Sequence, residues 1–184
     1  EYVEKHYMDM GMERKIILKE MKDDLYVYAA SYYYMEANTA SMLKALNVSY
    51  DVSDTAIENK VHRIEEDTGM ELDDMQMTAV KEAVKNGLLV ITGGPGTGKT
   101  TTINTIIRYF ESEGMDIFLA APTGRAAKRM SETTGFEART IHRMLELNGG
   151  MEGSAGFEKN EKNPLETDVI IIDEMSMVDI TLMH

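Results

Sequence analysis

Residues 88–101 read Leu-Leu-Val-Ile-Thr-Gly-Gly-Pro-Gly-Thr-Gly-Lys-Thr-Thr, and this stretch decides the fold. Its four apolar residues, 88–91, predict a short buried strand. The glycine-rich segment 93–100 then fits the pattern G-x-x-x-x-G-K-[ST] in full. The residues that follow, 101–110, predict a helix. Strand, loop and helix in this order are the context that a phosphate-binding loop (P-loop) requires.

The P-loop predicts a site for a nucleoside triphosphate, ATP, together with Mg²⁺. Its glycines let backbone N–H groups converge on the phosphates, and the following helix adds its positive N-terminal end. We expect Lys99 to reach the β- and γ-phosphates and Thr100 to offer its hydroxyl to Mg²⁺. A chance glycine-rich turn is the alternative, which the flanking strand and helix disfavour. The predicted nucleotide-binding residues of the loop are Gly94, Pro95, Gly96, Thr97, Gly98, Lys99, Thr100 and Thr101.

Helices and strands alternate from residue 73 onward, which indicates a parallel sheet covered by helices. The fold class that we predict is therefore α/β. Residues 148–167 are polar and glycine-rich, which predicts a loop or hairpin. The other elements expected after the P-loop helix are a strand at 117–121, a helix at 124–133, a helix at 141–147 opened by Thr140 as N-cap, and a buried strand at 169–172.

Residues 1–70 carry no catalytic signature and predict a small helical region or linker. Ile57, Val61 and Ile64 fall on one helical face, and Gly69 is placed to end that helix. The tyrosine-rich stretch 26–34 and the 16 methionines favour core or interface packing over base stacking. Because the chain starts without Met or a signal-peptide pattern, we expect a piece of a longer protein.

Composition predicts a soluble globular protein, with 43% hydrophobic and 28% charged residues. The lack of cysteine excludes disulfides and thiolate metal sites and fits a reducing compartment, so we expect the cytoplasm. No apolar run approaches the roughly 20 residues that span a bilayer, so no membrane partner is expected. A net charge of −13 argues against a nucleic-acid partner, but residues 116–143 are locally basic.

Residues 169–174 read Val-Ile-Ile-Ile-Asp-Glu, an apolar strand that ends in two carboxylates. Ligands of open α/β sheets bind beyond the carboxyl ends of the strands, so Asp173 is expected to hold Mg²⁺ there. Glu174 is placed to deprotonate the attacking water as a general base. Acidic residues after a strand are often solvated loop starts, but a P-loop in the same chain favours catalysis. The predicted catalytic residues are Lys99, Asp173 and Glu174, and the predicted metal ligands are Thr100 and Asp173.

Four segments in order resemble the RecD-like DNA helicases of superfamily 1, the family of the exonuclease V alpha subunit. They read ITGGPGTGKTT at 91–101, APTGRAAK at 121–128, TIHR at 140–143 and DEMSMVD at 173–179. Pif-like helicases share the last three segments and are the nearest alternative, whereas the Gly-Gly-Pro-Gly sequence of the first segment favours the RecD-like group. The resemblance implies a P-loop NTPase (RecA-like) motor domain over residues 71–184, truncated at its C-terminus.

This resemblance also implies the activity, an ATP-dependent translocase and helicase that moves 5′ to 3′ along single-stranded DNA, alone or with other subunits of a recombination nuclease. Gln76 matches the glutamine that reads adenine, for which an amide offers both donor and acceptor. A structural histidine is an equal alternative for His142, and Lys128, Arg129 and Arg143 are read as a solvated helix face. The DNA-binding residues implied are Pro122, Thr123, Gly124, Arg125, Thr140 and His142.

Two other classes of function stay open. A P-loop ATPase that remodels proteins would explain the loop and the carboxylates, but not residues 122–125 or 140–142. An interaction module would use the N-terminal region to dock a partner subunit. The sequence offers no candidate for an arginine finger. Because it stops just past the carboxylate strand, before the later helicase motifs and the second motor domain that the resemblance implies, we expect the chain alone neither to unwind DNA nor to hydrolyse ATP at a useful rate.

Overall fold

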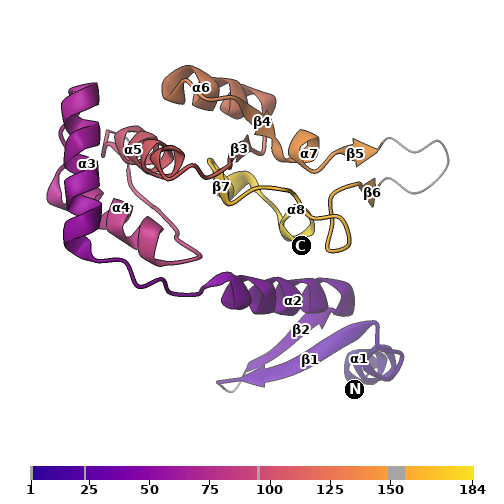
Figure 1. The fold of residues 1–184 in the computed structure, drawn as a ribbon. Coiled ribbons are helices and arrows are strands. Elements are labelled where there is room, and N and C mark those ends of the chain that lie inside the picture. The colour runs from indigo at the N-terminus through magenta and orange to yellow at the C-terminus, as the bar shows by residue number, and fades with distance from the viewer. Residues whose placement is uncertain (1, 23, 95, 149–155) are drawn as a thin grey trace. The chain divides into compact units, whose positions relative to one another are not determined.

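The computed structural model describes residues 2–22, 24–94, 96–148 and 156–184 (Figure 1). Contacts divide the chain into two compact units, one of Glu1–Asn47 with Val178–His184 and one of Val48–Met177. The two units divide at residues 47 and 48, before the domain boundary that the sequence predicts near residue 70. That domain boundary stays a prediction. No helix in the described part of the chain has the length and apolar character needed to cross a bilayer.

The first unit contains a β-hairpin that the sequence did not predict. Strands β1 (Ile16–Met21) and β2 (Asp24–Ala29) pair antiparallel, with Ile16 opposite Ala29. The expectation of helix is therefore wrong for residues 16–29, where β-branched and aromatic residues favour strand. The helices of this unit are α1 (Tyr2–Met12), α2 (Ala30–Leu46) and α8 (Ile180–Met183). Part of the tyrosine cluster is packed, since Tyr28 and Tyr33 meet edge to face at 5.6 Å.

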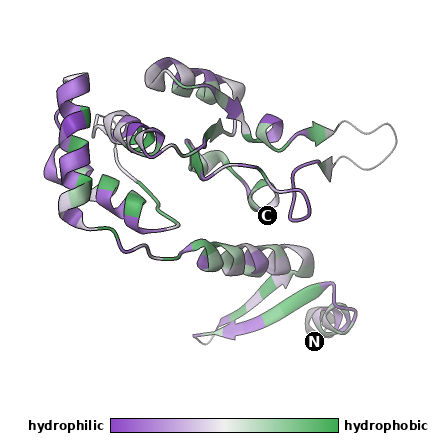
Figure 2. Ribbon diagram, viewed as in Figure 1, coloured by the Kyte–Doolittle hydropathy of each residue, from purple (hydrophilic) through white to green (hydrophobic). Residues whose placement is uncertain are grey.

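Three helices form the first core of the second unit: α3 (Asp54–Thr68), α4 (Asp74–Lys85) and α5 (Lys99–Ser112). The predicted apolar face of α3 is buried, and Gly69 ends the helix in the left-handed conformation, with φ +67°. Figure 2 shows mostly hydrophilic residues over the rest of α3. The buried side chains of this core are Ile57, Val61, Ile64, Val80, Ile106 and Tyr109.

A three-stranded parallel sheet confirms the predicted fold class. The strand order is β4 (Ala138–Thr140), β3 (Ile117–Ala121) and β7 (Val169–Ile172). A second core joins α5, β3 and α6 (Gly124–Thr134) through Ile107, Leu119 and Met130. Since all three strands run in the same direction, the segments that follow them lie at one edge of the sheet.

The strand predicted at residues 88–91 is not formed. These residues have no regular secondary structure, and Val90 is 76% exposed. An apolar run becomes a strand only where a neighbour accepts its backbone hydrogen bonds. Within the described residues, β7 pairs with β3 and no strand lies against residues 88–91.

The segment after β4 is shorter in helix than predicted. Thr140 caps a single turn, α7 (Ile141–Met144), because Leu145 already leaves the helix. Beyond it, β5 (Leu147–Asn148) and β6 (Gly156–Phe157) pair antiparallel, which confirms a hairpin in the polar segment. After β7, the chain forms a short 3₁₀ turn, η1 (Met175–Met177).

Candidate functional site

The P-loop leads directly into the start of α5. Gly96 and Gly98 have φ values of +77° and +72°, which favour glycine because a side chain would be strained there. Gly98 is the N-cap of α5, and no side chain caps it. The first N–H groups of an α-helix have no acceptor within the helix, and such a cluster suits phosphate oxygens. The loop geometry therefore fits the phosphates of a nucleotide; Pro95 lies outside the described residues.

Inside the loop, the predicted phosphate ligands bond to the loop itself. The Lys99 ammonium donates to the carbonyl oxygens of Gly93, at 2.5 Å, and Gly94, at 2.8 Å. The Thr97 hydroxyl also donates to the Gly94 carbonyl, at 2.9 Å. Thr100 is exposed in the first turn of α5, and Thr101 is half-buried beside it. For Lys99 to contact phosphate, its ammonium must leave these carbonyls.

Asp173 and Glu174 stand beyond the carboxyl end of β7, as predicted. The Asp173 N–H donates to the Ala120 carbonyl at 3.0 Å, and the Asp173 carboxylate accepts from the Glu174 N–H at 2.8 Å. Glu174 itself has a φ of +58°, a left-handed conformation that costs a non-glycine residue about 1 kcal/mol. Among the described residues, neither carboxylate is hydrogen-bonded or ion-paired to Lys99 or Thr100.

A magnesium ion would find few protein ligands here. In the part of the chain that the structure describes, no group of three or more His, Asp or Glu side chains could hold a metal. Mg²⁺ in nucleotide sites takes one or two protein oxygens and fills its shell with phosphates and water. The Thr100 hydroxyl and the Asp173 carboxylate match this limited donor set.

The two segments that resemble DNA-contact motifs meet at the same edge of the sheet. Ala121 pairs with Thr140 in the β3–β4 register, so the segment after β3 starts next to Thr140. Thr123 caps α6 by accepting from the Ala126 N–H at 3.2 Å, and Thr140 caps α7 by accepting from the Arg143 N–H at 3.2 Å. A hydroxyl that accepts from its own helix still has its O–H to donate, for example to a phosphate oxygen.

An open groove of about 550 Å³ lies between these two segments. Glu137 is the acid in its lining and is bound by Arg139 at 2.9 Å, a hydrogen bond that lowers the pKa of the Glu137 carboxyl. Arg143 has no ion-pair partner among the described residues. We call this the basic groove; the lining residues used below are Gly124, Lys128, Arg139, Thr140 and Arg143.

The basic groove gives a place to residues that the sequence analysis set aside. Lys128 and Arg143, which were read as a solvated helix face, line the groove while staying exposed. Their spacing carried the signal: Lys128 lies four residues after Gly124 and Arg143 three after Thr140, and both intervals place residues on one side of a helix start.

A family model described as an AAA domain matches residues 76–184, more than half of the chain. The chain belongs to the AAA domain family. This match begins at Gln76 and contains the P-loop, the basic groove and the carboxylate pair.

Relatives of this AAA domain confirm the resemblance to RecD-like proteins. The chain is 41% identical over 112 residues to the ATP-dependent RecD2 DNA helicase of Deinococcus radiodurans, covering 61% of the chain and 15% of the relative. It is 33% identical over 171 residues to the RecBCD enzyme subunit RecD of Haemophilus influenzae, covering 79% and 25%. The corresponding subunit of Mycolicibacterium smegmatis is 38% identical over 131 residues, covering 59% and 23%. The chain thus spans a quarter or less of these relatives.

Gln76 lies against the P-loop of the AAA domain. The side-chain oxygen of Gln76 accepts from the Asp73 backbone N–H at 2.9 Å, and the backbone N–H of Gln76 donates to the Asp73 carboxylate at 2.8 Å. These two hydrogen bonds form a capping box at the start of α4. A Cβ atom placed on Gly98 would collide with the nitrogen of the Gln76 side chain. Gly98 thus leaves room for an amide whose oxygen already caps α4 and whose nitrogen faces the loop.

The remaining residues implied for DNA binding are not gathered in the groove. Arg125 is exposed, in the first turn of α6, and Pro122 is half-buried before it. The His142 ring lies 5.9 Å from the Phe157 ring, centroid to centroid, next to the β5–β6 hairpin. The structure therefore brings Gly124 and Thr140 to one groove, whereas His142 contacts the hairpin.

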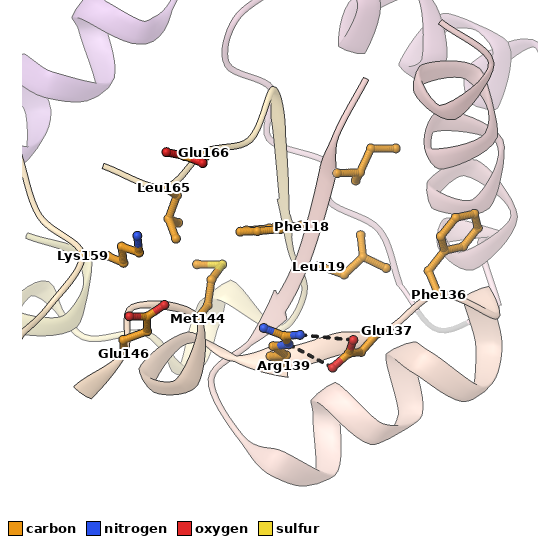
Figure 3. A pocket seen from close by; sticks show the side chains of 11 residues that line it. Phe118, Leu119, Phe136, Glu137, Arg139, Met144, Glu146, Lys159, Leu165 and Glu166 are labelled. Atoms are coloured by element: carbon orange, nitrogen blue, oxygen red, sulfur yellow. Dashed lines mark hydrogen bonds and ion pairs between the residues drawn. The ribbon is translucent and has the colours of Figure 1, made fainter. Parts of the chain in front are cut away.

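The AAA domain has a second cavity, of about 400 Å³, beside β3 (Figure 3). Phe118, Met144 and Leu165 form its apolar part, and the Arg139–Glu137 pair lies at one side. None of the residues predicted to bind nucleotide or DNA lines this cavity. We assign it no part in the chemistry.

Proposed function

We propose that this chain is the nucleotide-binding part of an ATP-dependent DNA helicase of the RecD-like type, with residues 71–184 in its first motor domain. The basic groove is the observation that carries this proposal. An ATPase that acts on proteins needs the P-loop and the carboxylates, but has no use for two capped helix starts and three basic side chains around one groove. Phosphates of a nucleic-acid backbone are the ligands that such donors suit.

The nucleotide would be held mainly by the P-loop. The N–H groups at the start of α5 would bind its phosphates, Lys99 would leave the Gly93 and Gly94 carbonyls to join them, and Gln76 would contact the base. Thr100 and Asp173 would hold Mg²⁺, which when bound offsets the negative charge of the phosphates. The residues proposed for the phosphates are Gly94, Pro95, Gly96, Thr97, Gly98, Lys99, Thr100 and Thr101.

Hydrolysis would proceed by in-line attack of water on the γ-phosphorus. Glu174 would orient that water and accept its proton, while Lys99 balances the charge on the phosphoryl oxygens. The new bond forms between the water oxygen and phosphorus as the bond to the bridging oxygen of ADP breaks.

Single-stranded DNA would pass along the basic groove. The hydroxyls of Thr123 and Thr140 and the Arg125 guanidinium would bind backbone phosphates, which positions a strand without reading its sequence. His142, on α7 with its ring beside Phe157 of the neighbouring hairpin, would add a further contact. We further propose that the protein moves 5′ to 3′ along the strand, works alongside other subunits of a recombination nuclease and is located in the cytoplasm. The family resemblance, and relatives that are named RecBCD subunits, support these proposals.

The test is the ATPase rate of the full-length protein with and without single-stranded DNA. We expect kcat to rise on adding an unstructured homopolymer such as oligo-dT, and the stimulation to weaken as salt is raised, because phosphate binding releases counterions. An ATPase that ignores single-stranded DNA at low salt would instead favour a protein-remodelling enzyme.

A further inference from the structure

Glu174, the proposed general base, is paired with the helix that begins at the proposed DNA contact. Its carboxylate lies 4.0 Å from the guanidinium of Arg129, which is on α6. The side chain of Arg129 is 74% exposed and that of Glu174 41% exposed. Of the ion pairs that the structure describes for basic residues 125–143, the pairs of Lys128 and Arg139 stay within that stretch, and only the Arg129 pair leaves it.

Both partners of this pair project from fixed backbone. On the α6 side, Ala127 and Met130 are buried, and the Asn104 side-chain amide of α5 donates to the Thr133 carbonyl at 3.1 Å. On the other side, the Glu174 N–H donates to Asp173, and the Glu174 carbonyl accepts from the Met177 N–H at 3.0 Å. The contact therefore depends on side-chain rotamers, and it can open without moving either element.

Arg129 also has a like-charged neighbour. Arg125 precedes it by four residues on α6, so the two guanidinium groups share one helix face and repel each other. Among the described residues, Arg125 has no ion-pair partner. A phosphate bound by Arg125 would relieve this repulsion and compete with Glu174 for Arg129. An ion pair as exposed as Arg129–Glu174 is weak enough to be displaced in this way.

We propose that Arg129 is a positioning residue for Glu174. Without DNA it holds the Glu174 carboxylate toward α6, and a DNA phosphate at the start of α6 takes over the guanidinium and leaves Glu174 free to orient water. This inference rests on the proposed function and adds to it a physical link between DNA binding and hydrolysis.

The test compares Arg129→Gln with Arg129→Lys in the full-length protein, by measuring kcat and KM for ATP without DNA and at saturating oligo-dT. We expect Arg129→Gln to raise kcat without DNA about twofold to fivefold, the range that the loss of an exposed ion pair allows. Its kcat at saturating DNA and its KM for ATP should stay within about twofold of the unmodified protein. Arg129→Lys, which keeps the charge, should restore most of the DNA dependence.

A matched control is Arg63→Gln, which removes one exposed positive charge from α3 and should leave both rates unchanged. If Arg129→Gln lowers both rates equally, or leaves the ratio of stimulated to basal rate unchanged, the inference is overturned while the proposed function stands. If the unmodified protein shows no stimulation by DNA, the proposed function falls, and release of Glu174 by DNA falls with it.

Discussion

The P-loop and the basic groove differ in how many of their hydrogen-bond donors already donate to other groups of the protein. In the P-loop, Lys99 and Thr97 donate to carbonyls of the loop itself. In the groove region, the Thr123 and Thr140 hydroxyls accept from their own helices and keep a proton to donate. A nucleotide must therefore replace internal hydrogen bonds, whereas the proposed DNA strand could accept from these two hydroxyls without breaking the helix caps. Nucleotide binding should depend on single residues, and DNA binding should be spread over several.

The largest effect should come from the core that connects the two regions. Ile107 of α5 is fully buried against Leu119 of β3 and Met130 of α6. Ile107→Ala should lower the free energy of unfolding by about 2–5 kcal/mol, through lost burial and the cavity left behind. Denaturant titration measures this change.

The matched smaller truncation is Ile107→Val, which removes a single methylene group and should cost only about 0.5–1.5 kcal/mol. Loss of nucleotide binding in Ile107→Ala with full retention of DNA binding would mean that the two regions are not joined through Ile107.

Lys99→Ala should separate the two regions. Removing a charge that stabilises the transferring phosphoryl group should lower kcat for ATP about 100-fold or more. The affinity for oligo-dT without nucleotide should stay unchanged, because the Lys99 ammonium donates to carbonyls of its own loop, Gly93 and Gly94. ATPase assays and fluorescence anisotropy with labelled oligo-dT measure the two quantities. An equal loss of DNA affinity would contradict the separation of the sites.

Gly98→Ala tests the contact between the P-loop and Gln76. Gly98 and Gly135 have nearly the same positive φ, +72° and +76°, and both cap a helix, but only a Cβ at Gly98 meets a neighbouring side chain. Gly135→Ala should cost about 1–2 kcal/mol of stability from backbone strain and leave ATP affinity intact. Gly98→Ala should weaken ATP binding as well, measured by calorimetry. Equal ATP affinity in the two variants would show that the Gln76 contact does not shape the loop.

The smallest effect per substituted residue is expected in the basic groove, on the affinity for DNA. The double variant Lys128→Gln with Arg143→Gln should reduce the slope of log affinity for oligo-dT against log salt by about 1.4, if each side chain neutralises one phosphate of a single strand. ATP affinity should not change, and Arg63→Gln again serves as control. An unchanged slope would mean that Lys128 and Arg143 do not bind phosphates and belong to a solvated helix face.

Local signals explain most of what could be predicted. The Thr140 cap, the Gly69 terminus and the strands at 117–121 and 169–172 each depend on residues near in sequence, and the structure confirms each of them. The strand at 88–91 failed because a strand needs a partner that is distant in sequence. The hairpin at 16–29 was missed because the helical pattern of residues 57–64 was extended to the whole N-terminal region, whereas the pairing of two strands leaves no helical-period signal.

The sequence by itself determined the family and the candidate residues of the site, since a P-loop pattern, a strand-end carboxylate pair and the two segments proposed to contact phosphate are defined by residue type and short spacing. Only the tertiary structure decided which residues come together: Thr140 and Gly124 line one groove, Gln76 lies against Gly98, and Arg129 pairs with Glu174. These contacts join residues far apart in the chain, and they depend on parallel strand pairing and on helix packing, which no local pattern specifies.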